Sequence, residues 1–256
     1  MSSAARSAIL PIMRVGPSSV KEPRLRRVGH KGADLITPGN TYGSFDAALA
    51  AGIDMIEFDV LPERSGDRLL LAHDYDDASS RAPLTLEEGL AHLASDPFTG
   101  IELDVDLKLP GYELRVVELL RSAGLVGRTL VSGMFPAALD LVRRAEPDLR
   151  LGWSVPRVRR DYTTDMLTAI PALAMLTGYR AMLPRRAREA LCERRFDAIM
   201  AHWRVVTPAL LRAVRDGGGE LYVWTVDDTR MIDRLTRMGV DGIITNDPRL
   251  FSQSDR

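Results

Sequence analysis

The sequence predicts an α/β fold, a (β/α)8 TIM barrel with a β-hairpin after the second strand. Short apolar runs alternate with amphipathic segments along most of the chain, which is typical of parallel strands joined by helices. Nine strands are expected, and one of them follows its predecessor after a turn too short for a parallel crossover. The other eight, with seven helical regions between them and no Gly-x-Gly-x-x-Gly motif after the first, favour a closed barrel over a dinucleotide-binding sheet.

Length and composition are consistent with one large domain and restrict its function. At 256 residues the chain fits a single barrel domain over residues 25–256, and the Pro and Ser content of residues 1–24 predicts a loosely ordered lead-in. The net charge of −1, from 34 basic and 35 acidic residues, argues against nucleic acid as a partner. The single cysteine, Cys192, excludes a disulfide framework and a cysteine-rich zinc site.

Targeting and membrane signals are weak. The apolar run from Ala8 to Met13 is too short for a secretory signal and is broken by Pro11. No later segment reaches the ~18 apolar residues of a membrane-spanning helix. We therefore expect a cytoplasmic protein with no integral membrane segment; the sequence does not define its oligomeric state.

The first strand is expected over residues 26–30, and it ends at His30. A helix then begins at Thr41, after the Pro-Gly-Asn sequence at 38–40. Its apolar residues recur at helical spacing until Gly52, which ends the helix.

Residues 54–74 predict a hairpin, with its turn at Ser65-Gly66-Asp67 and its second strand over residues 69–73. Side chains alternate along a strand, so Glu57 and Asp59 share one face. Two carboxylates on one buried face repel each other and require a cation or a protonated partner. If the two strands pair about Gly66, His73 comes out nearly opposite Asp59. A solvated, salt-bridged face is the alternative interpretation of this carboxylate pair.

The remaining elements alternate between helix and strand. A capping-type start at Thr85 predicts a helix over 85–94. The strand over 101–108 carries Glu102, Asp104 and Asp106 on one face. If Asp106 faces a site at the strand end, the other two face the barrel interior below it and need partners. Further helices are expected over 111–123, 135–145, 163–195 (interrupted near Pro171 and Pro184), 208–216 and 228–238, and strands over 128–132, 149–153, 197–202, 221–226 and 240–245.

Active sites of such barrels lie at the C-terminal ends of the strands, and the chemically unusual residues collect there. Three carboxylates without cysteine form an all-oxygen site that suits Mg²⁺ or Ca²⁺. Two histidines offer one acid and one base, and two lysines could neutralise an anion between them. The combination predicts a site for a phosphate diester. The candidate residues are His30 and His73 for proton transfer, Glu57, Asp59 and Asp106 for the metal, and Lys31, Lys108, His202 and Trp224 for the substrate.

His202 and Trp224 each have two interpretations, one functional and one structural. Both follow or end a strand, so they could line the substrate pocket. A structural role for His202 and a core position for Trp224 are the competing interpretations.

A series of motifs in the same residues resembles the glycerophosphodiester phosphodiesterase family over roughly residues 26–251. The resemblance implies a metal-dependent barrel that hydrolyses glycerophosphodiesters to glycerol 3-phosphate and an alcohol. It implies His30 and His73 as the acid and base pair, Glu57, Asp59 and Asp106 as metal ligands, and Lys108 as a phosphate contact. The motifs are His30-Lys31-Gly32, Pro38-Gly39-Asn40-Thr41, Glu57-Phe58-Asp59, His73-Asp74, Asp104-Val105-Asp106-Leu107-Lys108, Trp224-Thr225-Val226 and Gly242-Ile243-Ile244-Thr245-Asn246-Asp247-Pro248.

The chain departs from the family pattern at four places. Lys31 replaces the usual arginine and lacks its bidentate fork for phosphate. Gly39 replaces a glutamate, so one carboxylate is missing. Asp106 replaces a glutamate and reaches one methylene less far. Only residues 74–84 separate His73 from the next helix, where typical members carry a sizeable insertion, so the usual lid is absent.

These departures leave two alternatives open. The short loop and the Asp-x-Lys motif look like the related sphingomyelinase D and lysophospholipase D branch, which acts on long-chain phospholipids and often forms a cyclic phosphate. The cysteine pairs of that branch's secreted members are missing here. The other alternative is a catalytically lapsed barrel that binds a phosphorylated ligand or a protein.

Overall fold

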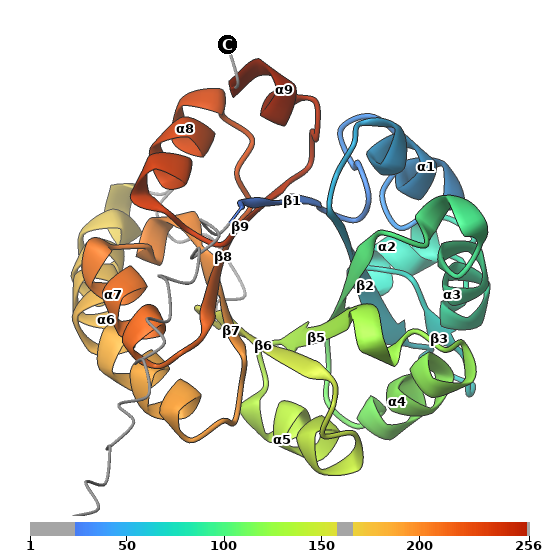
Figure 1. Ribbon diagram of the computed structural model, residues 1–256. Helices are drawn as coiled ribbons and strands as arrows, with labels where there is room; N and C mark the ends of the chain where they lie inside the picture. Colours follow the sequence, from blue (N-terminus) through green and yellow to red (C-terminus); the bar gives the residue numbers. More distant parts are fainter. Residues whose placement is uncertain (1–23, 158–165, 255–256) are drawn as a thin grey trace, which may run out of the picture.

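The computed structural model describes residues 24–157 and 166–254, and eight parallel strands in it form a closed barrel surrounded by helices (Figure 1). Strand β1 pairs with β9 on one side and with β2 on the other, which closes the ring. Strand β3 lies outside the ring and pairs antiparallel with β2, Leu61 opposite Leu70. The predicted (β/α)8 barrel with a hairpin after the second strand is therefore confirmed.

Two helices follow the hairpin, and from β4 onward strands and α-helices alternate strictly. The strands are β1 (Arg26–Gly29), β2 (Met55–Pro62), β3 (Leu69–Leu70), β4 (Glu102–Leu107), β5 (Thr129–Gly133), β6 (Arg150–Val155), β7 (Ala198–His202), β8 (Glu220–Trp224) and β9 (Gly242–Thr245). The helices are α1 (Tyr42–Ala50), α2 (Tyr75–Ser80), α3 (Leu86–Leu93), α4 (Glu113–Ser122), α5 (Pro136–Ala145), α6 (Met166–Cys192), α7 (Pro208–Asp216), α8 (Thr229–Met238) and α9 (Leu250–Ser254), with short 3-10 turns at Asp96–Phe98, Val126–Arg128 and Trp203–Val205.

Most predicted elements lie within about two residues of the observed ones, and the hairpin region differs most. Its second strand is only Leu69–Leu70, not 69–73. Helix α2 follows, which the sequence analysis did not predict. Asp74 explains this helix because its carboxylate accepts the backbone N–H groups of Asp76 and Asp77 at the helix start.

Helix α6 corrects a second expectation, because it continues through both prolines that were expected to interrupt it. A proline inside a helix costs about 3 kcal/mol through one lost hydrogen bond and a steric clash. On both sides of Pro184, the residues Leu183, Ala187 and Leu191 are buried, and this packing offsets the cost. The start of the predicted region, 163–165, lies outside the described residues. So does the predicted lead-in, except for Arg24.

Two hydrophobic cores hold the barrel together. The larger lies between the strands and the surrounding helices. The smaller lies inside the barrel, where side chains of alternate residues point inward. It consists of Val28, Met55, Leu130, Ala198, Met200, Tyr222 and Ile244. This apolar plug separates the two ends of the barrel interior.

A ring of four alternating charges lies at the N-terminal end of the barrel interior, below the plug. Arg26 contacts Glu102 and Glu220, at 3.2 Å each. Arg150 contacts Glu102 at 2.9 Å and also pairs with Glu220. These contacts provide the partners that Glu102 was expected to need. At this end of such barrels, polar networks serve stability.

Asp104 lies one inward-facing position above that ring and is almost completely buried. Burial raises its pKa to about 8, although a hydrogen bond with Ser132 acts in the opposite direction. The carboxyl group can therefore be accommodated in its neutral form at pH 7. None of the helices in the described part of the chain is long and apolar enough to cross a bilayer.

We predict that Arg150→Met lowers the free energy of unfolding by about 1–3 kcal/mol, because two carboxylates at the barrel floor each lose a cation. Urea denaturation measures this change. The matched control is Arg185→Met, because Arg185 pairs with Glu189 on an exposed helix face. This substitution should lower the free energy of unfolding by less than about 0.5 kcal/mol. Equal effects of the two substitutions would contradict a stabilising role for the ring.

Candidate active site

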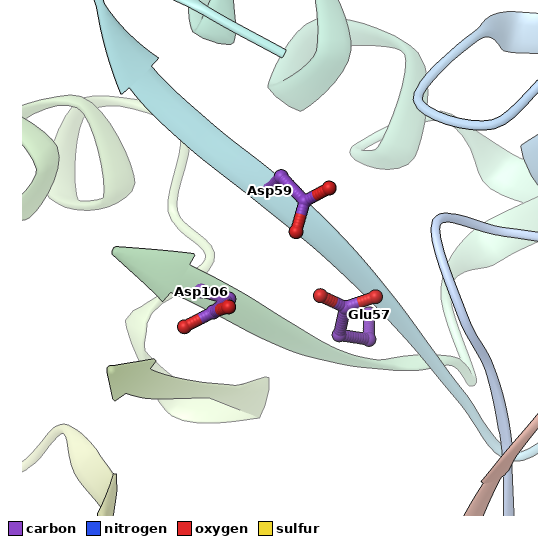
Figure 2. Close-up of side chains that lie close together, drawn as sticks. All are labelled: Glu57, Asp59 and Asp106. Atoms are coloured by element: carbon purple, nitrogen blue, oxygen red, sulfur yellow. The ribbon is translucent and has the colours of Figure 1, made fainter. Parts of the chain in front are cut away.

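The three predicted metal ligands converge at the C-terminal end of the barrel interior. Glu57 and Asp59 project from β2, and Asp106 from the neighbouring β4 (Figure 2). The strand register sets Asp59 beside Asp106. Carboxylate oxygens of all three residues lie within 4.8 Å of one another. Alternation along the strands, with the parallel register, is thus sufficient to assemble the cluster.

Lys108 is the cation next to this cluster. Its Nζ lies 2.5 Å from Asp59 Oδ1 and 2.5 Å from Asp106 Oδ2. Burial alone would lower the pKa of Lys108, but the charges of Asp106, Asp59 and Glu57 outweigh it and raise the pKa well above its ordinary value. The lysine is therefore charged.

One lysine does not balance three carboxylates, of which Glu57 and Asp59 are buried and Asp106 is partly buried. Burial, followed by the charge of Asp59, raises the pKa of Glu57 well above its usual value. Asp106 Oδ1 is buried and accepts no hydrogen bond from the described residues, and Asp59 Oδ1 has only its ion contact with Lys108. Oxygen donors with excess negative charge and a free coordination position suit a hard divalent cation.

His30 follows the last residue of β1 and is held by the end of the last strand. Its Nδ1 lies 2.5 Å from Asn246 Oδ1. The amide of Asn246 is oriented by Asp227, which accepts a hydrogen bond from Asn246 Nδ2 at 2.7 Å. Because the amide oxygen faces the ring, Nδ1 of His30 carries the proton and Nε2 is left free.

Nε2 of His30 therefore faces the carboxylate cluster, 3.8 Å from Glu57 Oε2. Burial lowers the pKa of His30 below its ordinary value of 6.5, although Asp59 and Asn246 act in the opposite direction. A neutral imidazole with its lone pair toward the cluster is the form that accepts a proton.

His73 lines a cavity together with Lys31 and Asn40, two residues that contact the carboxylates of the cluster. Its side chain is 51% exposed, whereas that of His30 is 18% exposed. Nδ1 of His73 lies 3.0 Å from Asp74 Oδ2, and its backbone N–H donates to Asp77. Burial would raise the pKa of Asp59, but the charge of Lys108, followed by His30 and His73, lowers it below its usual value. The two imidazoles differ in access to water.

The loop from Lys31 to Asn40 orients the carboxylates. The backbone N–H of Lys31 donates to Glu57 Oε2 at 2.8 Å. Asn40 Nδ2 donates to Asp59 Oδ2 at 2.9 Å, and Asn40 Oδ1 accepts the N–H of Asp59. Gly32 has φ +84°, and a Cβ there would lie 2.6 Å from the backbone of Ser44, so a side chain at this position would clash.

Several residues that build the site were not assigned roles from sequence. Asn40 and Asn246 both lie in motifs that were noted, but the pattern does not say what their side chains contact. Asp227 had no signal beyond its position after a strand. Their contacts cross from one strand end to another, so only the folded barrel identifies them.

Trp224 and His202 lie at the ends of β8 and β7, across the barrel from β2. Their rings meet edge to face with centroids 5.1 Å apart. Trp224 Nε1 donates to the carbonyl of Met200 at 2.8 Å, and its ring packs against the inner core. Both residues are at the barrel mouth, and contact with a substrate stays a prediction.

A cavity of about 440 Å³ opens beside His73. Every residue around it is polar, charged or small, and the lining contains no Leu, Ile, Val, Met, Phe, Tyr or Trp side chain. The lining consists of Lys31, Asp34, Pro38, Gly39, Asn40, His73, Asp74, Asp77 and Arg81.

Similarity to known proteins agrees with this geometry. Residues 112–250 match the model of the glycerophosphoryl diester phosphodiesterase family. A glycerophosphodiester phosphodiesterase of Arabidopsis thaliana is 27% identical over 259 residues, which cover 87% of this chain and 70% of the relative. One from Caldanaerobacter subterraneus is 24% identical over 255 residues, covering 86% and 93%.

The fold also matches solved structures. One is an Oleispira antarctica phosphodiesterase in complex with the product sn-glycerol-3-phosphate, with a TM-score of 0.65, 18% identity, and coverage of 90% of this chain and 96% of that one. The family model spans more than half of the chain, and the relatives extend the match across both halves of the barrel. The chain therefore belongs to the glycerophosphoryl diester phosphodiesterase family and is a phosphoric diester hydrolase.

Proposed function

We propose that this chain hydrolyses glycerophosphodiesters to glycerol 3-phosphate and an alcohol by metal-dependent, two-histidine acid and base catalysis. The observation that carries the proposal is the convergence of three carboxylates beside His30, with His73 lining the adjoining cavity together with Lys31 and Asn40. The product seen in the Oleispira antarctica enzyme supports glycerol 3-phosphate as the product here.

The two histidines take different roles in this proposal. His30 is the base, because its hydrogen bond to Asn246 leaves Nε2 unprotonated and directed at the cluster. It takes a proton from the nucleophile, either water or a hydroxyl of the substrate itself. His73 is the acid that protonates the leaving alcohol, because it lines the cavity proposed for that part of the substrate.

Charge on the phosphate is balanced by groups on both sides. Glu57, Asp59 and Asp106 would hold Mg²⁺ or Ca²⁺, and the bound ion would supply Lewis acidity toward the phosphate. Lys108 is fixed by two of these carboxylates, so its ammonium stabilises negative charge that develops at phosphorus. Lys31 provides a second cation at the cavity wall.

The cavity beside His73 favours a small, hydrophilic alcohol over a long-chain lipid. Its lining offers hydrogen-bonding groups and charges but no apolar channel. Trp224 and His202, across the barrel, are proposed to contact the glycerol side of the substrate. A lysophospholipase D activity is the second candidate, because helix α2 leaves the approach to His73 uncovered.

Product analysis separates these activities. We expect glycerol 3-phosphate from glycerophosphocholine and little turnover of lysophosphatidylcholine. EDTA should abolish the activity, and Mg²⁺ or Ca²⁺ should restore it. Lysophosphatidate or its cyclic form from the second substrate would instead support the lysophospholipase D activity. Ligand binding without any turnover would support a catalytically lapsed barrel.

We predict that His30→Ala and His73→Ala each lower kcat by about 10²–10⁴-fold, since each removes one proton-transfer group. The matched control is His92→Ala, because His92 lies on α3 with its ring against Asp46, outside the site. Circular dichroism and melting temperature should show that all three variants fold. A near-wild-type rate for either site variant contradicts the role given to that histidine.

The pH profile tests the role of His30 separately. A base acts only when neutral, so kcat/KM should fall as the pH drops through the pKa of His30. Burial sets that pKa below 6.5, and the hydrogen bond with Asn246 opposes this effect. Asn246→Ala should therefore move the acid limb to lower pH, while misorientation of the ring lowers kcat/KM about 10- to 100-fold. An acid limb that does not move would count against His30 as the base.

A further inference from the structure

We propose that Asp34 is a positioning residue for the phosphodiesterase reaction, and that it acts through Lys31. This inference rests on the proposed function, because it concerns how a substrate-binding lysine of that site is held. Asp34 lies in the loop between β1 and α1, and nothing in its sequence neighbourhood suggested a role.

The two carboxylate oxygens of Asp34 hold two different parts of the loop. Oδ2 lies 3.3 Å from Nζ of Lys31. Oδ1 accepts the backbone N–H of Gly39 at 2.8 Å. The carboxylate therefore links the residue after His30 to the residue before Asn40. These are the two points at which the loop enters the active site.

Gly39 is what makes room for this carboxylate. A Cβ on residue 39 would lie 2.6 Å from Asp34 Oδ1 and 2.7 Å from Lys31 Cβ. Both distances are shorter than carbon and oxygen atoms tolerate, so a side chain at position 39 would displace Asp34. The carboxylate of Asp34 thus occupies the space that a side chain at position 39 would need. Two departures from the family pattern, Lys31 and Gly39, belong to one matched arrangement with Asp34.

The loop needs such a link because its two ends are strained. Lys31 has φ +50° and Asn40 has φ +58°, and both are residues other than glycine in the left-handed region. Such a conformation is unfavourable for a residue with a side chain and persists only when its surroundings hold it. The N–H of Asn40 donates to the carbonyl of Lys31 at 3.0 Å, and Asp34 holds the segment between them.

Lys31 is placed where its charge can act on the reaction. Its ammonium lines the cavity that His73 also lines. The flexible side chain of a lysine would otherwise sample many positions. Asp34 occupies one of the three ammonium donors and leaves the others for a phosphate oxygen. The substitution of lysine for the usual arginine is thereby compensated by a fixed anchor.

A double-mutant cycle tests whether Asp34 acts through Lys31. Asp34→Asn keeps an oxygen that can accept the Gly39 N–H but removes the charge that holds Lys31. We expect KM for glycerophosphocholine to rise about tenfold, the size of one charge-assisted hydrogen bond, with kcat within about threefold. Lys31→Gln should have a similar effect, and Asp34→Asn should add less than twofold in the Lys31→Gln background.

The control is Asp140→Asn. Asp140 pairs with Arg195 at 2.8 Å far from the site, and its side chain is 29% exposed, compared with 32% for Asp34. It should leave KM unchanged. Melting temperatures of all variants distinguish lost anchoring from lost fold.

The outcomes separate this inference from the proposed function. Suppose that the wild type hydrolyses glycerophosphocholine but Asp34→Asn has the same KM as the wild type, or that the effects of the two substitutions on KM multiply in full in the double variant. In either case the role of Asp34 is wrong and the proposed function stands. If the wild type hydrolyses nothing, calorimetric binding of glycerol 3-phosphate to the same variants still tests the anchor. Absence of that binding in the wild type would overturn both.

Discussion

The structure depends above all on the cost of placing three carboxylates together in the barrel interior. Glu57, Asp59 and Asp106 would repel one another at this depth without nearby positive charge. Lys108 supplies part of it, and Asn40 and the backbone of Lys31 hold individual oxygens in place. These contacts lower the cost of burying the carboxylates. They also leave Asp59 Oδ1 and Asp106 Oδ1 without hydrogen bonds, and oxygens of this kind can bind a metal ion.

The apolar plug makes this charge separation useful. Below it, Arg26, Arg150 and their two glutamate partners neutralise one another and close the floor. Above it, three carboxylates face one lysine, so the charges are unbalanced. Because the plug excludes water between the two ends, electrostatic interactions at the catalytic end are screened less than they would be at a surface. The N-terminal end of the barrel interior therefore contains stabilising ion pairs, and the C-terminal end contains the candidate active site.

Closure of the barrel determines the state of His30. The pairing of β1 with β9 brings Asn246 next to a histidine that lies 216 positions earlier in the chain. The amide then selects the tautomer, and Asp227 selects the orientation of the amide. His73 instead takes its partner from the adjacent residue, Asp74, which also starts helix α2. His30 is thus held by a residue from the far end of the chain, and the more exposed His73 is held by its neighbour in sequence.

The sequence by itself determined the barrel, its hairpin and the residues at the strand ends, because periodicity and parity along a strand are local properties. Glu57 and Asp59 had to share a face, and Asp106 had to join them once β2 and β4 were neighbours. Only the tertiary structure identified the partners of Glu102 and Asp104, the hydrogen bond between His30 and Asn246, and the link from Asp34 to Lys31 and Gly39. Such contacts depend on strand register, barrel closure and loop conformation. Those are set by packing over the whole chain, and no local pattern of residues encodes them.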